Sequence, residues 1–172
     1  MRDQMRTCAI IGFGRFGRLL ARILREEFPV LVYDRHPDPI AARELGVEIV
    51  SLQAACAADA LFFAVPISEF ESAIREARAH LGPGRLILDT CSVKVHPIEV
   101  MRRELPPWVE ALGTHPLFGP DSARDGLRGL RIVFCPVRVS PVTLHFWRAF
   151  WQRRGVQVIE MSPDEHDRRA AY

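Results

Sequence analysis

The sequence predicts an α/β domain built on a doubly wound, mainly parallel sheet. Short apolar runs rich in β-branched residues alternate with helical stretches from one end of the chain to the other, as they do when helices connect parallel strands. A glycine-rich turn, "GFGRFG", joins the first apolar run to the first helical stretch. The 172 residues, 48% of them hydrophobic, suffice for one domain with a hydrophobic core.

The individual elements follow from the spacing of apolar residues. Strands are expected where apolar residues run together, and helices where they recur at intervals of three and four. In the first helix, Leu19, Leu20, Ile23 and Leu24 form one face that packs on the sheet. In chain order, we expect strand 7–11, helix 15–27, strand 30–33, helix 40–45, strands 47–50 and 60–65, helix 68–80, strand 86–89, helix 97–104, strands 109–112 and 132–135, helix 141–154 and strand 156–160.

Composition and charge exclude several classes of partner. The net charge is only +2 and the arginines are interspersed with acids, so nucleic acid is not an expected partner. The first apolar run is too short for a signal peptide or a membrane span, so we expect a cytoplasmic protein that binds no membrane. Cys8, Cys56, Cys91 and Cys135 lack the spacing of metal ligands, so we expect reduced, partly buried thiols and no metal.

The glycine-rich turn has the GxGxxG pattern of a dinucleotide site, formed by Gly12, Gly14 and Gly17. In a Rossmann-like fold, the first glycine makes the tight turn, the second admits a pyrophosphate, and the third lets the helix pack closely on the strand. The N-terminus of the following helix offers N–H groups to the phosphates. Asp34 ends the next strand about 20 residues later, where an acid binds the adenosine ribose.

These features make NAD the expected cofactor. The charge of Asp34 would repel the 2′-phosphate of NADP, but Arg35 and His36 follow and could bind that phosphate, so NADP remains an alternative. Val65 and Pro66 follow the fourth strand and would flank the dinucleotide. The expected cofactor-binding residues are Gly12, Phe13, Gly14, Arg15, Phe16, Gly17, Asp34, Arg35, Val65, Pro66 and Ser92.

The final stretch, "MSPDEHDRRAAY", has the residues that typically begin a helix but none of those that typically end one. Ser162 suits the N-cap, Pro163 the first helical position, and Glu165 completes a capping box. We therefore expect residues 1–161 to form a dinucleotide-binding domain and residues 162–172 to begin a helix that links it to a further domain. The alternative is a naturally short chain.

Three more stretches follow the glycine-rich turn in order: "DTCSVK", "THPLFGPDS" and "SPDEHDRRAA". Together the four motifs resemble those of the prephenate and arogenate dehydrogenases of tyrosine biosynthesis. The residues of the motifs are most similar to those of the plant-type arogenate dehydrogenases. The resemblance implies an NAD(P)-dependent oxidative decarboxylation, in which a hydride passes to the nicotinamide, carbon dioxide leaves and the substrate ring becomes aromatic. A Rossmann dehydrogenase acting on a β-hydroxyacid fits less well, because "THPLFGP" is absent from its usual motifs.

The histidine of "THPLFGPDS" is the residue type that this chemistry requires. As the hydride leaves, the substrate hydroxyl becomes a carbonyl and sheds a proton, which a neutral imidazole can accept. The resemblance therefore makes His115 the catalytic base, held in a loop stiffened by prolines and glycines. It also makes Ser92 a hydrogen-bonding partner near His115 and the reacting hydroxyl; the alternative is that this serine caps the next helix.

Asp125 is the expected determinant of substrate choice. Arogenate carries an ammonium group where prephenate has a keto group, so an acid in the substrate pocket favours arogenate. Asp121 is an alternative position for this acid, and an aspartate before Gly126 also suits a plain turn. Prephenate therefore stays open as the substrate.

Members of the resembled family continue into a helical domain that makes a homodimer and supplies an arginine for the substrate carboxylate. This chain ends before such a domain, so dinucleotide binding is expected with weak or absent turnover. The alternative hypothesis is that the chain is a stand-alone NAD(P)-binding module that has lost its catalytic activity. Lys94 is expected either to orient its loop or attract the substrate, or to be solvated. His166 and Asp167 are expected to support either the structure or the residues that contact the substrate, and direct contact with the substrate is the alternative.

Overall fold

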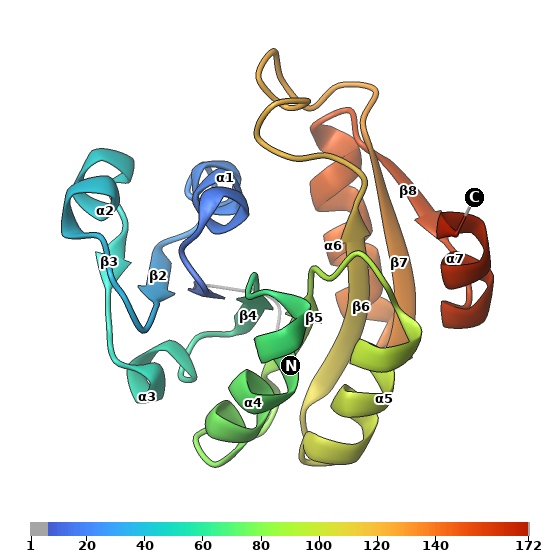
Figure 1. Ribbon diagram of the computed structural model, residues 1–172, viewed down its shortest axis with the longest axis horizontal. Helices are drawn as coiled ribbons and strands as arrows, with labels where there is room; N and C mark the ends of the chain where they lie inside the picture. Colours follow the sequence, from blue (N-terminus) through green and yellow to red (C-terminus); the bar gives the residue numbers. More distant parts are fainter. Residues whose placement is uncertain (1–6, 172) are drawn as a thin grey trace.

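The computed structural model describes residues 7–171, so the polar residues before Thr7 and the last residue lie outside it. The described residues form one eight-stranded sheet with helices on both faces (Figure 1). The strands are β1 (Cys8–Ile11), β2 (Val30–Tyr33), β3 (Glu48–Ile49), β4 (Ala60–Phe63), β5 (Leu86–Asp89), β6 (Glu110–Pro116), β7 (Arg131–Arg138) and β8 (Gln157–Glu160). The helices are α1 (Arg15–Leu24), α2 (Pro39–Leu45), α3 (Leu52–Ala55), α4 (Ile67–Arg78), α5 (Val95–Glu104), α6 (Pro141–Arg153) and α7 (Pro163–Ala170).

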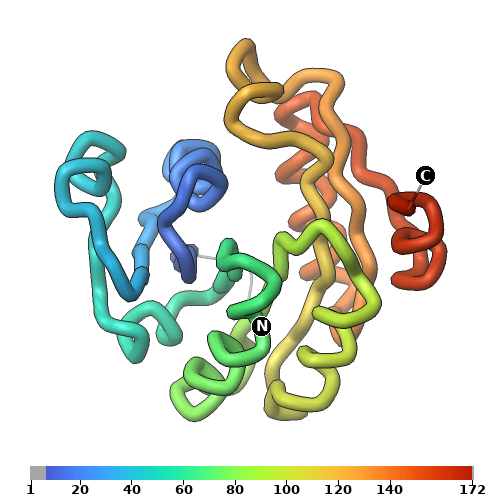
Figure 2. The backbone as a smooth tube through the Cα atoms, viewed as in Figure 1, coloured from blue at the N-terminus to red at the C-terminus, as the bar shows by residue number. Residues whose placement is uncertain are grey.

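The order of the strands confirms the doubly wound α/β fold. It is β3-β2-β1-β4-β5-β6-β7-β8, and neighbouring strands are parallel except for β6 and β7. The chain passes from β1 through β2 to β3 and then crosses back to β4 on the other side of β1, as the tube in Figure 2 shows. Ligands of such sheets bind at this reversal, outside the carboxyl ends of the strands.

Alternate residues of each strand point to opposite faces of the sheet and so build two cores. In β1, Cys8 and Ile10 belong to the core beneath α1, α2 and α6, whereas Ala9 and Ile11 belong to the core beneath α3, α4 and α5. Both faces are therefore covered, which explains why the strands read as nearly continuous apolar runs.

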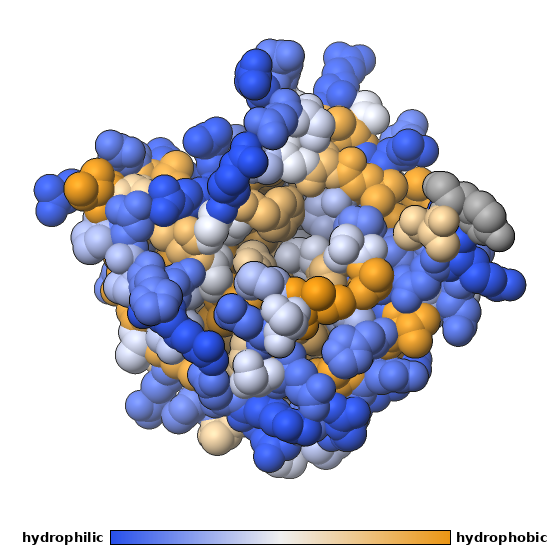
Figure 3. Space-filling model, in the orientation of Figure 1, coloured by the Kyte–Doolittle hydropathy of each residue, from blue (hydrophilic) through white to orange (hydrophobic). Residues whose placement is uncertain are grey.

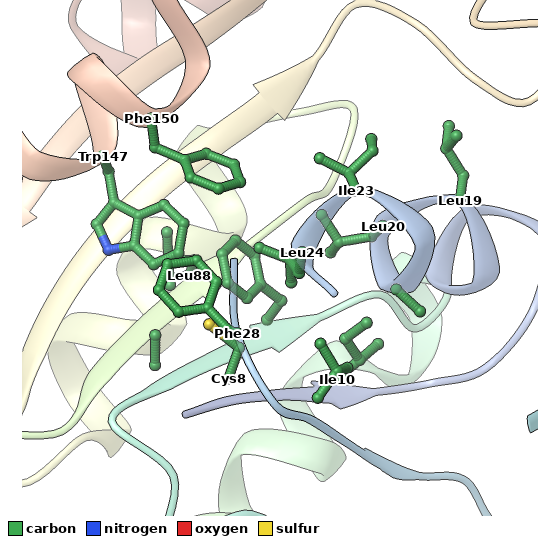
Figure 4. Packing of buried hydrophobic residues seen from close by; sticks show 14 of the residues in the cluster. Cys8, Ile10, Leu19, Leu20, Ile23, Leu24, Phe28, Leu88, Trp147 and Phe150 are labelled. Atoms are coloured by element: carbon green, nitrogen blue, oxygen red, sulfur yellow. The ribbon is translucent and has the colours of Figure 1, made fainter. Parts of the chain in front are cut away.

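An aromatic cluster in the first core connects the beginning of the fold to its end. The rings of Phe28, Trp147 and Phe150 lie with centroids 5.1 to 5.9 Å apart. Figure 4 shows Trp147 and Phe150 reaching from their helix toward Phe28 and the apolar face of α1. This contact holds α6 against the same sheet face as α1.

The structure corrects the expected end of β6. The strand runs on to Pro116 instead of stopping at 112, and His115 pairs with Val133 of β7. The prediction that a stiff loop holds His115 is therefore wrong. Proline is tolerated because its missing N–H would point toward β5, whose pairing with β6 ends at Leu112, while Leu117 donates to the Arg131 carbonyl on the other side.

Other differences are smaller. The short helix α3 was not predicted, and it begins where the Ser51 hydroxyl accepts a hydrogen bond from the Ala54 N–H (3.2 Å). Several helix ends differ from the expected ones by a few residues, which is the usual uncertainty of such boundaries. None of the helices in residues 7–171 combines the length and the apolarity that a membrane crossing requires.

Candidate active site

The turn between β1 and α1 is shaped by its glycines. Gly12 has a φ of 101°, and a Cβ atom there would lie 2.7 Å from the Ala64 carbonyl oxygen. A Cβ atom on Gly17 would lie 2.1 Å from the Gly12 carbonyl oxygen, so glycine is what allows α1 to pack this closely. At Gly14, by contrast, no described atom lies within 4 Å of where a Cβ would be. The backbone at Gly14 is thus open to a ligand.

Asp34 connects the end of β2 to this turn. One carboxylate oxygen accepts a hydrogen bond from the Phe13 N–H (2.6 Å) and the other from the His36 N–H (2.7 Å). The carboxylate is thereby fixed beside a cavity of about 250 Å³, which lies between the ends of β1 and β2 and the helices α3 and α4. Each oxygen of an ionised carboxylate can accept a further hydrogen bond, so Asp34 remains able to bind a hydroxyl group.

Acidic side chains outnumber basic ones around this cavity. Asp34, Glu69 and Glu76 line it together with Arg35 and His36. The guanidinium of Arg35 lies 2.6 Å from a carboxylate oxygen of Glu76 on α4, and both side chains are about half exposed. The arginine that could receive a 2′-phosphate is therefore already paired with an acid.

The other predicted cofactor-binding residues surround the turn in different ways. The Phe13 side chain is buried in the core below it, and Phe16 packs partly buried against the same core. Arg15 is exposed at the first position of α1. Val65 lines the cavity, while Pro66 is exposed where α4 begins. The turn itself therefore presents mainly backbone to the space above the sheet.

His115 lies near the end of β6, at the same carboxyl edge of the sheet as the glycine turn. Three strand spacings separate β6 from β1, or about 14 Å along this edge. The Nδ1 atom of the partly buried His115 lies 2.8 Å from Nε2 of His166 on α7. The Nδ1 atom of His166 lies 2.7 Å from a carboxylate oxygen of Asp167. We call these three side chains the histidine chain.

The surroundings of His115 keep it neutral. Burial, with smaller contributions from the nearby His166 and Lys94, lowers the pKa of His115 to about 4, while Asp167 opposes the lowering. Burial raises the pKa of Asp167, but hydrogen bonds from His166 and from the backbone outweigh it and hold this pKa below its ordinary value. Near neutral pH the site therefore contains an uncharged imidazole and an ionised carboxylate.

Lys94 supports the site from beneath. Its side chain is fully buried, and its ammonium group contacts the buried carboxylate of Asp89 and donates to the Thr114 carbonyl (2.6 Å). Asp89 also accepts from the Thr114 N–H (3.0 Å), next to His115. The interpretation of Lys94 as a solvated side chain is thus wrong, and its contacts are those of a residue that orients the neighbouring strand. The attraction between the opposite charges of Lys94 and Asp89 offsets the free-energy cost of burying them.

The predicted substrate residues lie on the connections above this edge. Ser92 is exposed in the bend between β5 and α5. Asp125 is exposed on the connection between β6 and β7, which rises above the sheet in Figure 1. Asp121 on the same connection pairs with Arg15 at the start of α1 (3.2 Å), so this connection contacts the glycine turn. In the view of Figure 3, which has the orientation of Figure 1, hydrophobic side chains gather near the centre of the molecule and hydrophilic ones lie around them.

Sequence reasoning missed the contact between His115 and His166. The two residues are 51 positions apart, and nothing in their local sequence indicates that α7 folds back onto β6. The buried state of Lys94 was missed for the same reason, since its partner Asp89 ends a different element. Within residues 7–171, no group of three or more histidine, cysteine or acidic side chains is placed to hold a metal ion.

The sequence is similar to a family model and to several proteins of known name. A family model described as the nucleotide-binding domain of prephenate dehydrogenase matches residues 20–160. Arogenate dehydrogenase 1, chloroplastic, of Arabidopsis thaliana is 33% identical over 95% of this chain and 27% of its own length. A probable arogenate/prephenate dehydrogenase of Methanocaldococcus jannaschii is 32% identical over 98% of this chain and 39% of its own length. The chain thus spans well under half the length of these two relatives.

Two solved structures share the fold. An arogenate dehydrogenase from Synechocystis superposes with a TM-score of 0.83 at 23% identity, covering 96% of this chain and 63% of the other. A prephenate dehydrogenase from A. aeolicus, solved with hydroxyphenyl propionate and NAD+, superposes with a TM-score of 0.78 at 23% identity, covering 95% of this chain and 62% of the other.

Proposed function

The chain belongs to the prephenate dehydrogenase family, to whose nucleotide-binding domain residues 20–160 correspond, and from this premise we propose that it binds NAD and serves the oxidative decarboxylation of arogenate or prephenate in tyrosine biosynthesis. One observation carries the proposal. An open glycine turn and a neutral, partly buried histidine lie along the same carboxyl edge of one sheet. A dinucleotide bound at the turn supplies the hydride acceptor, and the histidine supplies the base.

The residues at the turn fit a dinucleotide, and their charges favour NAD over NADP. Gly14 leaves room for a pyrophosphate, and α1 begins there without a side-chain cap, so its first N–H groups are available. Asp34 is fixed where it would accept hydrogen bonds from ribose hydroxyls. The pairing of Arg35 with Glu76 and the excess of acids in the cavity oppose a 2′-phosphate.

We propose that His115 and Ser92 act on the substrate. When the hydride leaves the carbon that bears the hydroxyl group, His115 accepts the hydroxyl proton, and its lowered pKa means that the ring is unprotonated and has a free lone pair at neutral pH. Ser92 is exposed at the carboxyl end of β5, the strand next to β6, and would hydrogen-bond to the same oxygen. When the ring becomes aromatic, the proton held on His115 can return to that oxygen.

Arogenate is the proposed substrate because of the acids on the connection between β6 and β7. Asp121 already pairs with Arg15, whereas Asp125 presents an exposed carboxylate on the same connection. We therefore assign to Asp125 the charge-assisted hydrogen bond to the ammonium group of arogenate. Prephenate, which has no ammonium group, would gain nothing from this contact.

The proposed organisation places residues 1–161 in the dinucleotide-binding domain and residues 162–172 at the start of a helix linking it to a helical, dimer-forming domain. The predicted cap is confirmed, since the Ser162 hydroxyl accepts from the Glu165 N–H (3.2 Å). Because α7 carries His166 and Asp167, the linking helix would contribute to the site directly. All four cysteines are free and buried, which suits the reducing cytoplasm that we propose as its compartment.

The test uses the purified 172-residue chain. Calorimetric titration measures its affinity for NAD and for NADP, and the absorbance of the reduced nicotinamide is followed with arogenate or prephenate in all four combinations. We expect NAD to bind more tightly than NADP, and any reduction by this chain to be weak and to occur with NAD and arogenate. Tight binding without reduction in any combination would mean that residues 1–172 form the cofactor-binding half only and that further catalytic groups are needed for turnover. Failure to bind either dinucleotide would contradict the proposal.

A variant separates catalysis from binding. His115→Asn removes the base but leaves the glycine turn unchanged, so we expect unchanged affinity for NAD and, in a version that includes the helical domain, loss of turnover. An equal loss of both would show that His115 supports the fold instead of the reaction. His145→Asn, an exposed histidine on α6, is the matched control and should change neither quantity.

A further inference from the structure

We propose that Asp167 and His166 are positioning residues that fix the tautomer of His115, so that hydrogen is carried on Nδ1 and Nε2 is the proton acceptor. The histidine chain joins β6 to α7 through contacts of 2.8 and 2.7 Å. The catalytic meaning of this tautomer rests on the proposed function, whereas the tautomer itself is a property of the chain that can be measured without turnover.

The assignment starts at Asp167. Its carboxylate accepts hydrogen bonds from the backbone N–H groups of Lys94 (2.7 Å) and Val95 (2.9 Å), where α5 begins. These bonds and the histidine stabilise the ionised form, in line with the lowered pKa. An ionised carboxylate only accepts hydrogen bonds, so the Nδ1 atom of His166 must be the donor.

The second step passes through His166. Its side chain is only 3% exposed, so its ring nitrogens find their partners within the protein. A neutral His166 ring is part of the proposal, and a neutral ring that donates from Nδ1 has its lone pair on Nε2. This lone pair faces Nδ1 of His115 at 2.8 Å, which makes Nδ1 of His115 the donor. The Nε2 atom of His115 is then left with the lone pair, and it is the atom able to take a proton.

The charges around the chain support the same assignment. The ammonium group of Lys94 is compensated by Asp89, and both are fully buried. Asp167 is therefore the negative charge that remains at the end of the histidine chain. When Nε2 of His115 takes up a proton, the resulting imidazolium donates from Nδ1 into a chain that ends in a carboxylate, which partly offsets the effect of burial on the charged ring.

The reaction step balances with this tautomer. The C–H bond breaks and its electron pair leaves as hydride to the nicotinamide, while the O–H bond breaks and its proton bonds to Nε2 of His115. The electron pair of the former O–H bond completes the carbonyl. The proton on Nδ1 stays in place, so no proton has to move along the chain.

The decisive experiment is nuclear magnetic resonance of the 172-residue chain labelled with nitrogen-15 in its histidines. Long-range proton–nitrogen correlations at neutral pH distinguish a protonated ring nitrogen from an unprotonated one. We expect His115 and His166 both to carry hydrogen on Nδ1. Hydrogen on Nε2 of His115 in the wild-type chain would overturn the proposal, whether or not the chain turns over substrate.

Two variants test the cause. His166→Leu removes the acceptor, so we expect His115 to populate the Nε2–H tautomer, and in a chain that turns over we expect kcat to fall by about 10- to 100-fold with unchanged affinity for NAD. Asp167→Asn removes the charge that forces His166 to donate, so we expect a mixture of tautomers at His115. The controls are His145→Leu and Asp164→Asn, an exposed acid on the same helix as Asp167.

Both controls should keep the wild-type tautomer. If His115 kept hydrogen on Nδ1 in folded His166→Leu and Asp167→Asn variants, as judged by circular dichroism, the proposal would be wrong. If the leucine variant failed to fold, the wild-type and Asp167→Asn spectra would still decide. Loss of turnover with the expected tautomers would count against the proposed function alone.

Discussion

Glu76 pairs with Arg35 beside the cavity that contains Asp34, and this contact bears on cofactor choice. We expect Glu76→Gln to free Arg35 and to remove one negative charge, so that affinity for NADP rises about fivefold, which corresponds to roughly 1 kcal/mol. Affinity for NAD should change little. Calorimetric titration with both dinucleotides measures the effect.

The control for this substitution is Glu71→Gln on the same helix. Glu71 pairs with Arg75 and Arg103, which do not line the cavity, so the preference for NAD should be unchanged. An unchanged ratio of the two affinities in Glu76→Gln would show that Arg35 does not reach the 2′-position.

The glycines of the turn allow binding to be separated from folding. Gly14 has an extended backbone with a φ of −77° and open space at its Cβ position, so Gly14→Ala should change the free energy of unfolding by less than about 0.5 kcal/mol. The added methyl group occupies the space proposed for the pyrophosphate, so affinity for NAD should fall about tenfold or more. Chemical denaturation and calorimetry check the two expectations.

Gly17→Ala is expected to lower the stability of the fold, in contrast to Gly14→Ala. Its Cβ atom would meet the Gly12 carbonyl oxygen at 2.1 Å, so α1 must shift, and we expect a loss of stability of about 2 kcal/mol or more. If Gly14→Ala destabilised the chain as much as Gly17→Ala, the open space at Gly14 would have a structural role instead of a binding one.

At the scale of elements, α6 is held to the sheet by its aromatic side chains. Trp147 is fully buried, and its ring contacts Phe28, Phe62 and Phe150. We expect Trp147→Ala to lower the free energy of unfolding by about 3 to 5 kcal/mol through the cavity that it leaves. The midpoint of chemical denaturation measures this loss.

A second substitution at the same position separates ring volume from polarity. The indole N–H of Trp147 is buried without a hydrogen-bond partner among the described residues, so Trp147→Phe removes an unsatisfied donor along with part of the ring. It should cost less than about 1.5 kcal/mol. Trp108→Ala, at a residue that is 55% exposed, is the control and should cost less than about 1 kcal/mol. Equal losses at the two tryptophans would contradict the role assigned to α6.

The elements also show what the sequence could and could not predict. Local apolar spacing was enough for the eight strands and the doubly wound fold, because the central strands β1, β4 and β5 are buried on both faces. It failed at Pro116, where the cost of a missing N–H depends on where β5 ends, and at the short helix that begins after Ser51. It also failed for Lys94 and His166, whose burial depends on partners in other elements. The roles of His115, Ser92 and Asp125 stay predictions.

For the whole molecule, His115 makes stability depend on pH. Its pKa is about 4 in the folded chain against an ordinary 6.5, so between these values the unfolded chain binds the extra proton. The free energy of unfolding should therefore fall as the pH decreases from 6.5 to 4. Below pH 4, His115 should cause no further decrease. The full shift corresponds to at most about 3 kcal/mol, since one pKa unit is worth about 1.4 kcal/mol.

Chemical denaturation at pH 7 and at pH 4.5 measures this dependence. Other groups titrate over the same range, so the informative quantity is the difference between the wild-type chain and His115→Asn. We expect the variant to lose less stability on acidification than the wild-type chain does. An identical loss in both would mean that His115 titrates normally in the folded state.

The position of α7 has a consequence for anyone who recombines such domains. A junction at residue 161 follows the last strand and looks like a natural seam, yet the helix beyond it holds His166 and Asp167 against β6 and α5. A chimaera joined there would inherit the histidine from one parent and the groups that orient it from the other. A chimaera that keeps His115 with the residues that orient it should therefore exchange α7 together with the sheet, even though the last strand ends before α7 begins.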